Sequence, residues 1–250
     1  MFAPLPRESL GQRVHRELRQ RILDGRLPVG ERLPAERDLA ASLGVNRGAV
    51  RESLKRLQQS GLVSIRHGGG TQVREWRRHA GIELLPHLLL DGQGQVRAAA
   101  VRGLMALRNG LAPTVAERAA ARAEAAPPAA RDTAPNTELS TALAALEAAE
   151  GAARQPLALA YWSALVDAAD DLGLRLAFNT LEQTYGAAQA ALATVLRPEY
   201  ERLDEPRRIT AAVLAGDPGA AARAAREYVA FGAAAVEAWL RRYAPPESRA

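Results

Sequence analysis

The strongest constraint on this chain is a pattern in residues 32–73, where two short helical stretches meet at a turn and strand-like residues follow around three consecutive glycines. Pro34 stands where a helix can begin. Leu39 and Leu43 repeat at the four-residue spacing of one helix face. Gly44 follows directly and can end that helix in a left-handed conformation. The connection to the next helix is therefore predicted to be tight.

That next helix is predicted from Asn46 to about Ser60. The Asn46 side chain can accept a hydrogen bond from a free amide in the first turn. Its apolar positions have helical spacing: Val50, Leu54 and Leu57. An earlier amphipathic helix is predicted over about residues 8–24, with Gly25 as its stop and an apolar stripe of Leu10, Val14, Leu18 and Ile22.

Two strands complete this unit. Val63 and Ile65 alternate with polar neighbours, Val73 continues the alternation, and the glycines at 68–70 permit a tight tip. Three helices followed by a two-stranded wing form a winged helix-turn-helix. We expect this domain to cover residues 1–75.

The exposed face of the helix after Asn46 carries cations. Arg47, Arg51 and Lys55 are four residues apart, about 100° around the helix from the apolar stripe. The N-terminal end of a recognition helix reaches base edges in the major groove. Arg47 and Arg51 are therefore candidates for guanine contacts, because a guanidinium can pair bidentately with O6 and N7. Asn46 either contacts a base or caps the helix, and the two roles are compatible.

Arg66 and His67 flank the predicted wing tip, beside Gly68. Such a tip can lie against phosphate or enter a minor groove. A glycine-rich loop can also cradle a nucleotide, but no Lys-Ser/Thr pair and no helix follows here, which disfavours that alternative. His67 is either an ordinary surface histidine or a DNA contact.

Charge is divided unevenly along the chain. Residues 1–78 hold 16 Lys and Arg against 8 Asp and Glu, whereas the remainder holds 17 against 20. This division favours a basic module that approaches a polyanion, although an Arg-rich surface that is merely solvated would have the same composition. There is no cysteine, no apolar run of membrane-spanning length and no secretion signal. We therefore expect a cytoplasmic protein without membrane contact.

Residues 8–74 carry four motifs: Pro28-x-Gly30-x-x-Leu33-Pro34-x-Glu36-Arg37-x-Leu39-Ala40, Arg47-x-x-Val50-Arg51-x-x-Leu54-x-x-Leu57, Gly61-Leu62-Val63 and His67-Gly68-x-Gly70-Thr71-x-Val73. Together they resemble the GntR superfamily of bacterial transcription regulators. The resemblance implies DNA contacts at Arg37, Asn46, Arg47, Gly48, Ala49, Arg51, His67 and Gly68. Relatives often have a phosphate-bonding Thr or Ser where this chain has Gly48 and Ala49, so their operator preference does not carry over.

Residues 76–250 are rich in Ala, Leu and Arg with helical periodicity, which predicts an all-helical bundle for effector binding and dimerisation. The fold class is thus mostly α. Expected helices cover about 79–90, 95–125, 137–151, 156–172, 174–194, 198–215 and 217–243. An all-helical second domain resembles the FadR-type branch, in which many members hold a metal through Asp and three His. The positions that would align with those ligands are Ala158, Trp162, Pro206 and Tyr228, so we expect no metal and no other cofactor.

Arg108 lies on the apolar side of its expected helix, so its charge should be paired by a protein carboxylate or by an anionic effector. Asn179 and Tyr185 are interpreted as structural hydrogen-bonding residues or as pocket lining. Tyr161, Trp162 and Trp239 are interpreted as core or as pocket. The candidate effector residues are Arg108, Tyr161, Asn179, Tyr185, Tyr228 and Trp239.

The sequence therefore predicts a homodimeric repressor or activator that binds a pseudo-palindromic operator in double-stranded DNA and responds to a small molecule. An acyl-CoA and a small organic acid are the rival effectors, and a ligand-independent DNA-binding protein is a further alternative. No motif of paired carboxylates or activated nucleophile is present, so no enzyme activity is expected. A non-specific architectural protein would be expected to have a basic second domain, which this chain lacks.

Overall fold

The computed structural model describes residues 9–66, 68–125, 134–187 and 194–243. The chain divides into two compact units, Met1–Val96 and Arg97–Ala250.

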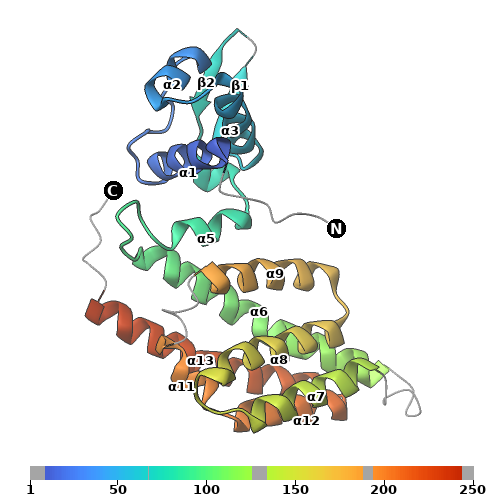
Figure 1. Cartoon of the computed structure of the whole chain (residues 1–250). Coiled ribbons are helices and arrows are strands. Elements are labelled where there is room, and N and C mark those ends of the chain that lie inside the picture. The colour runs from blue at the N-terminus through green and yellow to red at the C-terminus, as the bar shows by residue number, and fades with distance from the viewer. Residues whose placement is uncertain (1–8, 67, 126–133, 188–193, 244–250) are drawn as a thin grey trace, which may run out of the picture. The chain divides into compact units, whose positions relative to one another are not determined.

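The first unit begins with three helices, labelled in Figure 1: α1 (Leu10–Leu23), α2 (Glu36–Leu43) and α3 (Arg47–Gln59). Ser9 and Gln12 form a reciprocal capping box that starts α1. Gly44 ends α2 with φ of 65°, as its position predicted. Asn46 caps α3 through its side chain. The three predicted helices are confirmed to within about two residues at each end.

The apolar stripes of these helices meet in one core. Val50, Leu54 and Leu57 of α3 are completely or almost completely buried, and they join the inward faces of α1 and α2 in a single cluster. Leu10, expected in the stripe of α1, is instead exposed because it lies in the first turn, beyond the edge of this cluster.

The wing consists of β1 (Val63–Arg66) and β2 (Gly70–Val73), paired antiparallel so that Val63 lies opposite Val73. Ile65 is 37% exposed, because the hairpin extends beyond the core that covers Val63. The segment before α2 also holds the wing, through backbone bonds from Gly30 to Val73 and from Leu33 to Thr71, each 2.9 Å long. The sequence patterns did not predict this additional pairing.

The prediction of one helix over residues 79–90 is wrong. This region contains two four-residue helices, α4 (Trp76–His79) and α5 (Leu85–Leu88), with a 3₁₀ turn at Ile82–Leu84 between them. Leu84 is buried in the core of the first unit, and Trp76 and Leu88 pack against that core. This packing explains why the units divide after Val96, about 20 residues beyond the boundary expected from the sequence.

The secondary structure described in the second unit is entirely helical, with short turns between the helices. Its longer helices are α6 (Ala98–Ala125), α7 (Ala134–Ala148), α8 (Arg154–Ala169), α9 (Leu172–Ala187), α12 (Asp204–Ala215) and α13 (Pro218–Tyr243). The expected helix 198–215 is interrupted at residues 201–203, which separates the four-residue α11 (Arg197–Tyr200) from α12. The end of the expected helix 174–194 falls partly outside the described residues.

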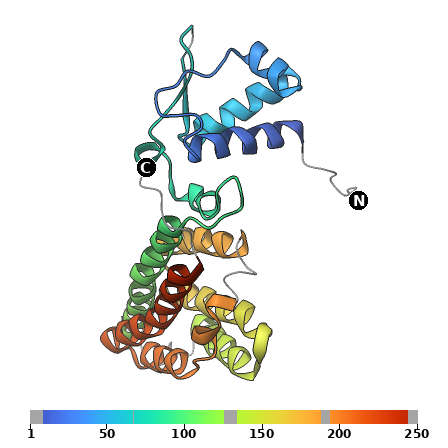
Figure 2. The same cartoon turned by 90° about the vertical axis from the view of Figure 1, so that its left-hand side faces the viewer.

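The longest helices, α6 and α13, run side by side through this bundle, as both views show (Figures 1 and 2). About half of their buried positions are alanines, which let two helix backbones approach closely. Completely buried examples are Ala116, Ala120, Ala221 and Ala225. No helix among the described segments is long and apolar enough to cross a membrane.

We expect Gly61→Ala to lower the free energy of unfolding more than Gly25→Ala. Both glycines have positive φ, 72° and 73°, so each alanine costs about 1–2 kcal/mol for the left-handed backbone. At Gly61 the added methyl group would also overlap the His79 carbonyl, whereas nothing lies within 4 Å at Gly25. Urea unfolding measures both losses, and equal losses would contradict the close packing of α4 on this unit.

Candidate nucleic-acid interface and effector cavity

The start of α3 is defined by Asn46. Its Oδ1 accepts a hydrogen bond from the amide of Ala49 at 2.8 Å, so the capping interpretation is confirmed. Arg47 is therefore the first residue of the helix. Since that end of a recognition helix approaches base edges, the cap fixes which side chains occupy it.

The cations of α3 divide into two groups. Arg47, Arg51 and Lys55 are exposed, and none of them forms an ion pair with a described residue. Arg56 instead pairs with Glu52 at 2.5 Å. At about 100° per residue, Arg56 lies about 180° around the helix from Arg47 and about 140° from Arg51. The α3 reading face, which we define as Arg47, Arg51 and Lys55, thus has cations available to an external anion.

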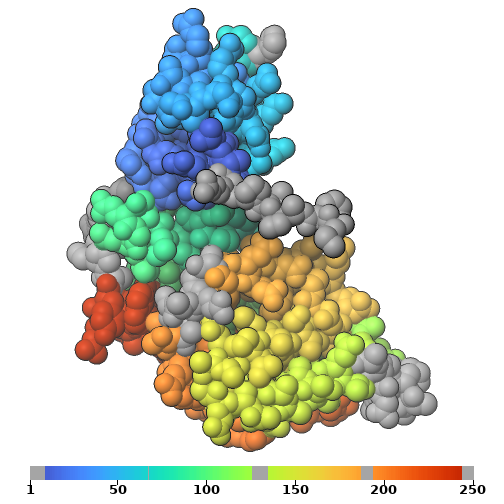
Figure 3. All heavy atoms as spheres, viewed as in Figure 1, coloured from blue at the N-terminus to red at the C-terminus, as the bar shows by residue number. Residues whose placement is uncertain are grey.

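Further predicted contact residues surround this face. Arg37 of α2 is 82% exposed and makes one exposed contact, to Asp38. Gly48, Arg66 and Gly68 are exposed, the last two at the wing tip, whereas His67 lies outside the described residues. In the space-filling view, the light-blue atoms of the α2–α3 region lie at the surface (Figure 3).

Ala49 does not suit the contact implied by the family resemblance. Its side chain is 8% exposed, and its amide already donates to Asn46. The position faces the core because the helix turns it toward Val50 and Ser53, both of which are buried.

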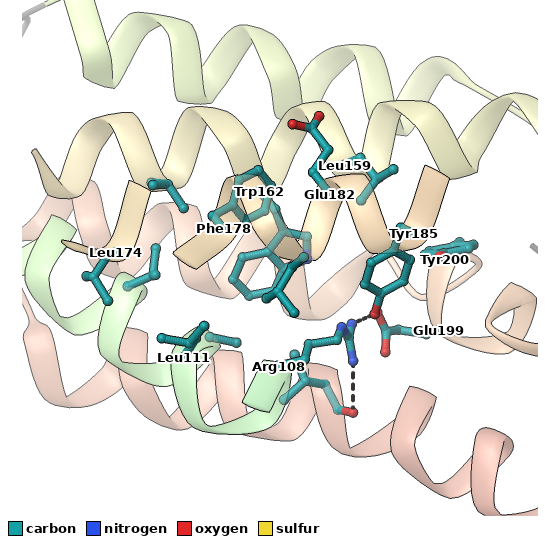
Figure 4. A pocket seen from close by; sticks show the side chains of 15 residues that line it. Arg108, Leu111, Leu159, Trp162, Leu174, Phe178, Glu182, Tyr185, Glu199 and Tyr200 are labelled. Carbon is teal, nitrogen blue, oxygen red and sulfur yellow. Dashed lines mark hydrogen bonds and ion pairs between the residues drawn. The ribbon is translucent and has the colours of Figure 1, made fainter. Parts of the chain in front are cut away.

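Arg108 has a protein partner in the second unit. It extends from α6 and pairs with Glu199 of α11, and both side chains are buried (Figure 4). The Arg108 guanidinium also donates to the backbone carbonyl of Val229 in α13, at 3.4 Å. Burial raises the pKa of the Glu199 carboxyl, and the charge of Arg108 opposes that rise. Of the two alternatives for Arg108, the structure therefore contains the internal salt bridge.

A cavity of about 50 Å³ adjoins this ion pair. Arg108 and Glu199 lie at its polar end, and its other walls are mainly apolar side chains of α6, α8 and α9, including Leu111, Trp162 and Phe178 (Figure 4). Tyr185 of α9 also lines it. The Tyr185 hydroxyl is buried without a hydrogen-bond partner among the described residues, and burial raises its pKa to about 12.

Only two of the six predicted effector residues, Arg108 and Tyr185, line this cavity. Tyr161 is a core residue whose hydroxyl bonds the Pro206 carbonyl at 3.0 Å and the Thr210 hydroxyl at 3.1 Å. Asn179 follows the lining residue Phe178 on α9 and is not itself in the wall. Helix rotation turns both side chains away from this cavity, so Tyr161 has the core role that was one of its two interpretations, and effector binding by Tyr161 or Asn179 stays a prediction.

Two further aromatic candidates also lie outside the cavity wall. Tyr228 stacks on Trp162 with ring centroids 6.1 Å apart, so it supports the wall from behind. Trp239 lies near Tyr243 toward the end of α13. Sequence reasoning missed Glu199 and Tyr200, since a lone acid after a proline carries no signal that it pairs with an arginine 91 residues away.

The described residues contain no group of three or more His, Cys, Asp or Glu side chains that would hold a metal ion. Three of the residues at positions that would align with the metal ligands of relatives are buried in the bundle: Ala158, Trp162 and Tyr228.

Comparison with known proteins identifies the family. Residues 10–73 match the model of the bacterial regulatory proteins of the gntR family. Mce2R, an HTH-type transcriptional regulator of Mycobacterium tuberculosis, is 37% identical over 225 residues, which cover 90% of each chain. This chain belongs to the GntR family. It is accordingly a DNA-binding transcription regulator.

Two further relatives are similar to most or to part of the chain. The uncharacterized HTH-type regulator Rv0494 of M. tuberculosis is 34% identical, covering 92% of this chain and 90% of that one. A fatty acid metabolism regulator protein of Vibrio cholerae is 38% identical over 93 residues, 37% of this chain and 33% of that one. This similarity agrees with the FadR-type resemblance.

A solved structure supports the same fold for this GntR regulator. It belongs to Lar, which controls expression of the Listeria monocytogenes agr system. The TM-score is 0.55 at 16% identity, covering 94% of this chain and 99% of that one.

Replacing Asn46 tests the cap that begins α3. We expect Asn46→Ala to lower the free energy of unfolding by about 1 kcal/mol, because the Ala49 amide loses its acceptor. Asn46→Asp should retain most of the stability, since its carboxylate can accept the same bond. Thermal unfolding of the two variants checks this, and an equal loss in both would contradict a capping role.

Proposed function

We propose that this GntR-family regulator recognises a specific operator through the α3 reading face. The observation that carries the proposal is the division of cations on α3: those on the reading face have no ion-pair partner among the described residues, whereas Arg56 on the opposite face is neutralised by Glu52. Arg47 and Arg51 would pair with guanine edges in the major groove, because their guanidinium groups can donate two parallel hydrogen bonds. Lys55, one turn farther along, would contact phosphate.

The wing adds a second contact. Arg66 lies beside a glycine tip whose small residues permit close approach to a phosphate backbone or to the minor groove. His67 would join this contact. Arg37, which is exposed at the start of α2, would meet a phosphate near the reading helix. These contacts position the reading helix, while Arg47 and Arg51 supply sequence discrimination.

We further propose that the protein acts as a homodimer on a pseudo-palindromic operator and that a small molecule bound in the helical bundle controls it. A two-fold symmetric dimer presents two reading heads to two half-sites, which matches the usual geometry of helix-turn-helix regulators. Binding of the small molecule would shift the bundle between two arrangements with different affinities for DNA.

The cavity beside Arg108 supports a small organic acid over an acyl-CoA as effector. Its volume of about 50 Å³ is far below the roughly 300–1,000 Å³ of most ligand pockets. The similarity to a fatty acid metabolism regulator covers only 37% of this chain. It therefore does not support a fatty-acid-derived ligand in the helical bundle.

Selection of bound sequences from a random DNA pool tests specificity. With the selected operator, we expect Arg47→Ala and Arg51→Ala each to cost about 1–3 kcal/mol of binding free energy and to relax the preference at one base pair. Arg56→Ala is the matched control: it removes the same charge from the opposite face of the same helix. Equal losses in all three variants would contradict a reading face.

Salt dependence separates phosphate from base contacts. Lys55→Ala should weaken binding to every sequence alike and reduce the slope of log affinity against log salt by about one. Fluorescence anisotropy with the operator and with a scrambled duplex measures both effects. A selective loss on the operator alone would assign Lys55 to base recognition instead.

A further inference from the structure

The polar end of the bundle cavity is already occupied by a carboxylate of the protein itself. Glu199 reaches Arg108 from α11, the four-residue helix that packs against α8 and α13. Burying an ion pair is expensive, because two charges lose their hydration, and equally shaped apolar residues are often more stabilising. The pair is therefore better explained by what it does in the cavity than by its contribution to stability.

The surroundings of the pair are built to admit this carboxylate. Gly232 lies within α13, where glycine is less favourable than alanine by about 1 kcal/mol. A Cβ atom at this position would overlap the Glu199 carboxylate and come 2.9 Å from the Leu196 side chain. The Glu199 carboxylate therefore occupies space that a side chain at position 232 would fill.

The cavity also contains an unused donor next to the pair. The Tyr185 hydroxyl points toward Arg108 and Glu199 (Figure 4) and has no partner among the described residues. Its raised pKa keeps it protonated, so it can donate a hydrogen bond. Buried polar groups are normally hydrogen-bonded. A second carboxylate in this space would satisfy Tyr185 and Arg108 together.

We propose that Glu199 is an internal substitute for the effector, and that a small carboxylic acid with an apolar body replaces it on Arg108. This inference rests on the proposed effector site in the bundle and names its ligand class. The carboxylate of the ligand would accept from Arg108 and Tyr185, and its apolar body would lie among Leu111, Trp162 and Phe178. The amide or thioester group that replaces the carboxylate in a derivative of the same acid is neutral, so it cannot take the place of the Glu199 carboxylate on Arg108.

Displacement of Glu199 provides a route from the ligand to the rest of the bundle. The 50 Å³ cavity must enlarge to hold such an acid, and α11, which carries Glu199, is a short element beside it. Movement of α11 changes its packing on α13, which runs along α6. Helix α6 begins at Ala98, directly after the division between the two units. The ligand thus acts on the helix that continues from the DNA-reading unit.

Titration calorimetry and thermal shift test this with butyrate and hexanoate, their primary amides and hexanoyl-CoA. We expect the two acids to bind the wild-type protein and raise its melting temperature, and the amides and the thioester to bind at least about tenfold more weakly. Glu199→Gln removes the competing charge, so it should bind the acids about tenfold or more tightly than the wild-type protein does. Glu237→Gln is the control, since it breaks the exposed Arg102–Glu237 pair between α6 and α13.

Arg108→Gln should lose acid binding. If this variant does not fold, the acid–amide comparison on the wild-type protein and the Glu199→Gln affinities decide the matter. Equal binding of acid and amide, equal affinity of wild-type and Glu199→Gln proteins, or no acid binding to either would overturn the inference. Selection of operator DNA with the wild-type protein separates failure of this inference from failure of the proposed function. If the protein binds a specific operator but gives any of these three results, only the carboxylate site is overturned. If it binds no specific operator, the proposed function is overturned as well.

Discussion

Burial of the apolar side of α3 is the constraint on which the DNA-reading unit depends. Val50, Leu54 and Leu57 are each removed from water against α1 and α2, and burying such a side chain is worth about 1.5–3 kcal/mol. Exposed ion pairs contribute about 0–1 kcal/mol. Burial therefore decides the rotation of the helix. The arginines of the reading face point outward because their positions on the helix leave them no other direction.

In the second unit, a buried ion pair interrupts the apolar core. Most of its core is alanine and leucine, which pack two long helices closely, but Arg108 and Glu199 place full charges inside it. Such a pair gives a bundle little stability. The pair does give the cavity a polar end. The Tyr185 hydroxyl adjoins the pair, and the missing side chain at Gly232 leaves space for the Glu199 carboxylate, so α9 and α13 both accommodate the ion pair.

Sequence patterns predicted the first unit well because its signals are local. The Asn46 cap, the Gly44 stop and the four-residue spacing of the apolar stripe each act within one or two helical turns. Where packing between distant segments decides the outcome, the patterns failed. Residues 79–90 have helical periodicity, yet Leu84 enters the core of the first unit and the helix is broken around it. In the alanine-rich bundle, weak contrast between faces also hid which of Tyr161, Asn179 and Tyr185 lines the cavity.

The sequence by itself determined the fold class, the reading helix and the outward position of Arg47 and Arg51, since helix geometry relates those residues directly to their buried neighbours. It also showed that Arg108 needed a partner, because an uncompensated charge is costly in an apolar setting. Only the tertiary structure decided that the partner is Glu199, that the first unit extends to Val96, and that Tyr185 lines the cavity. Each of these depends on which helices become neighbours, and that choice is made by the packing of the whole chain.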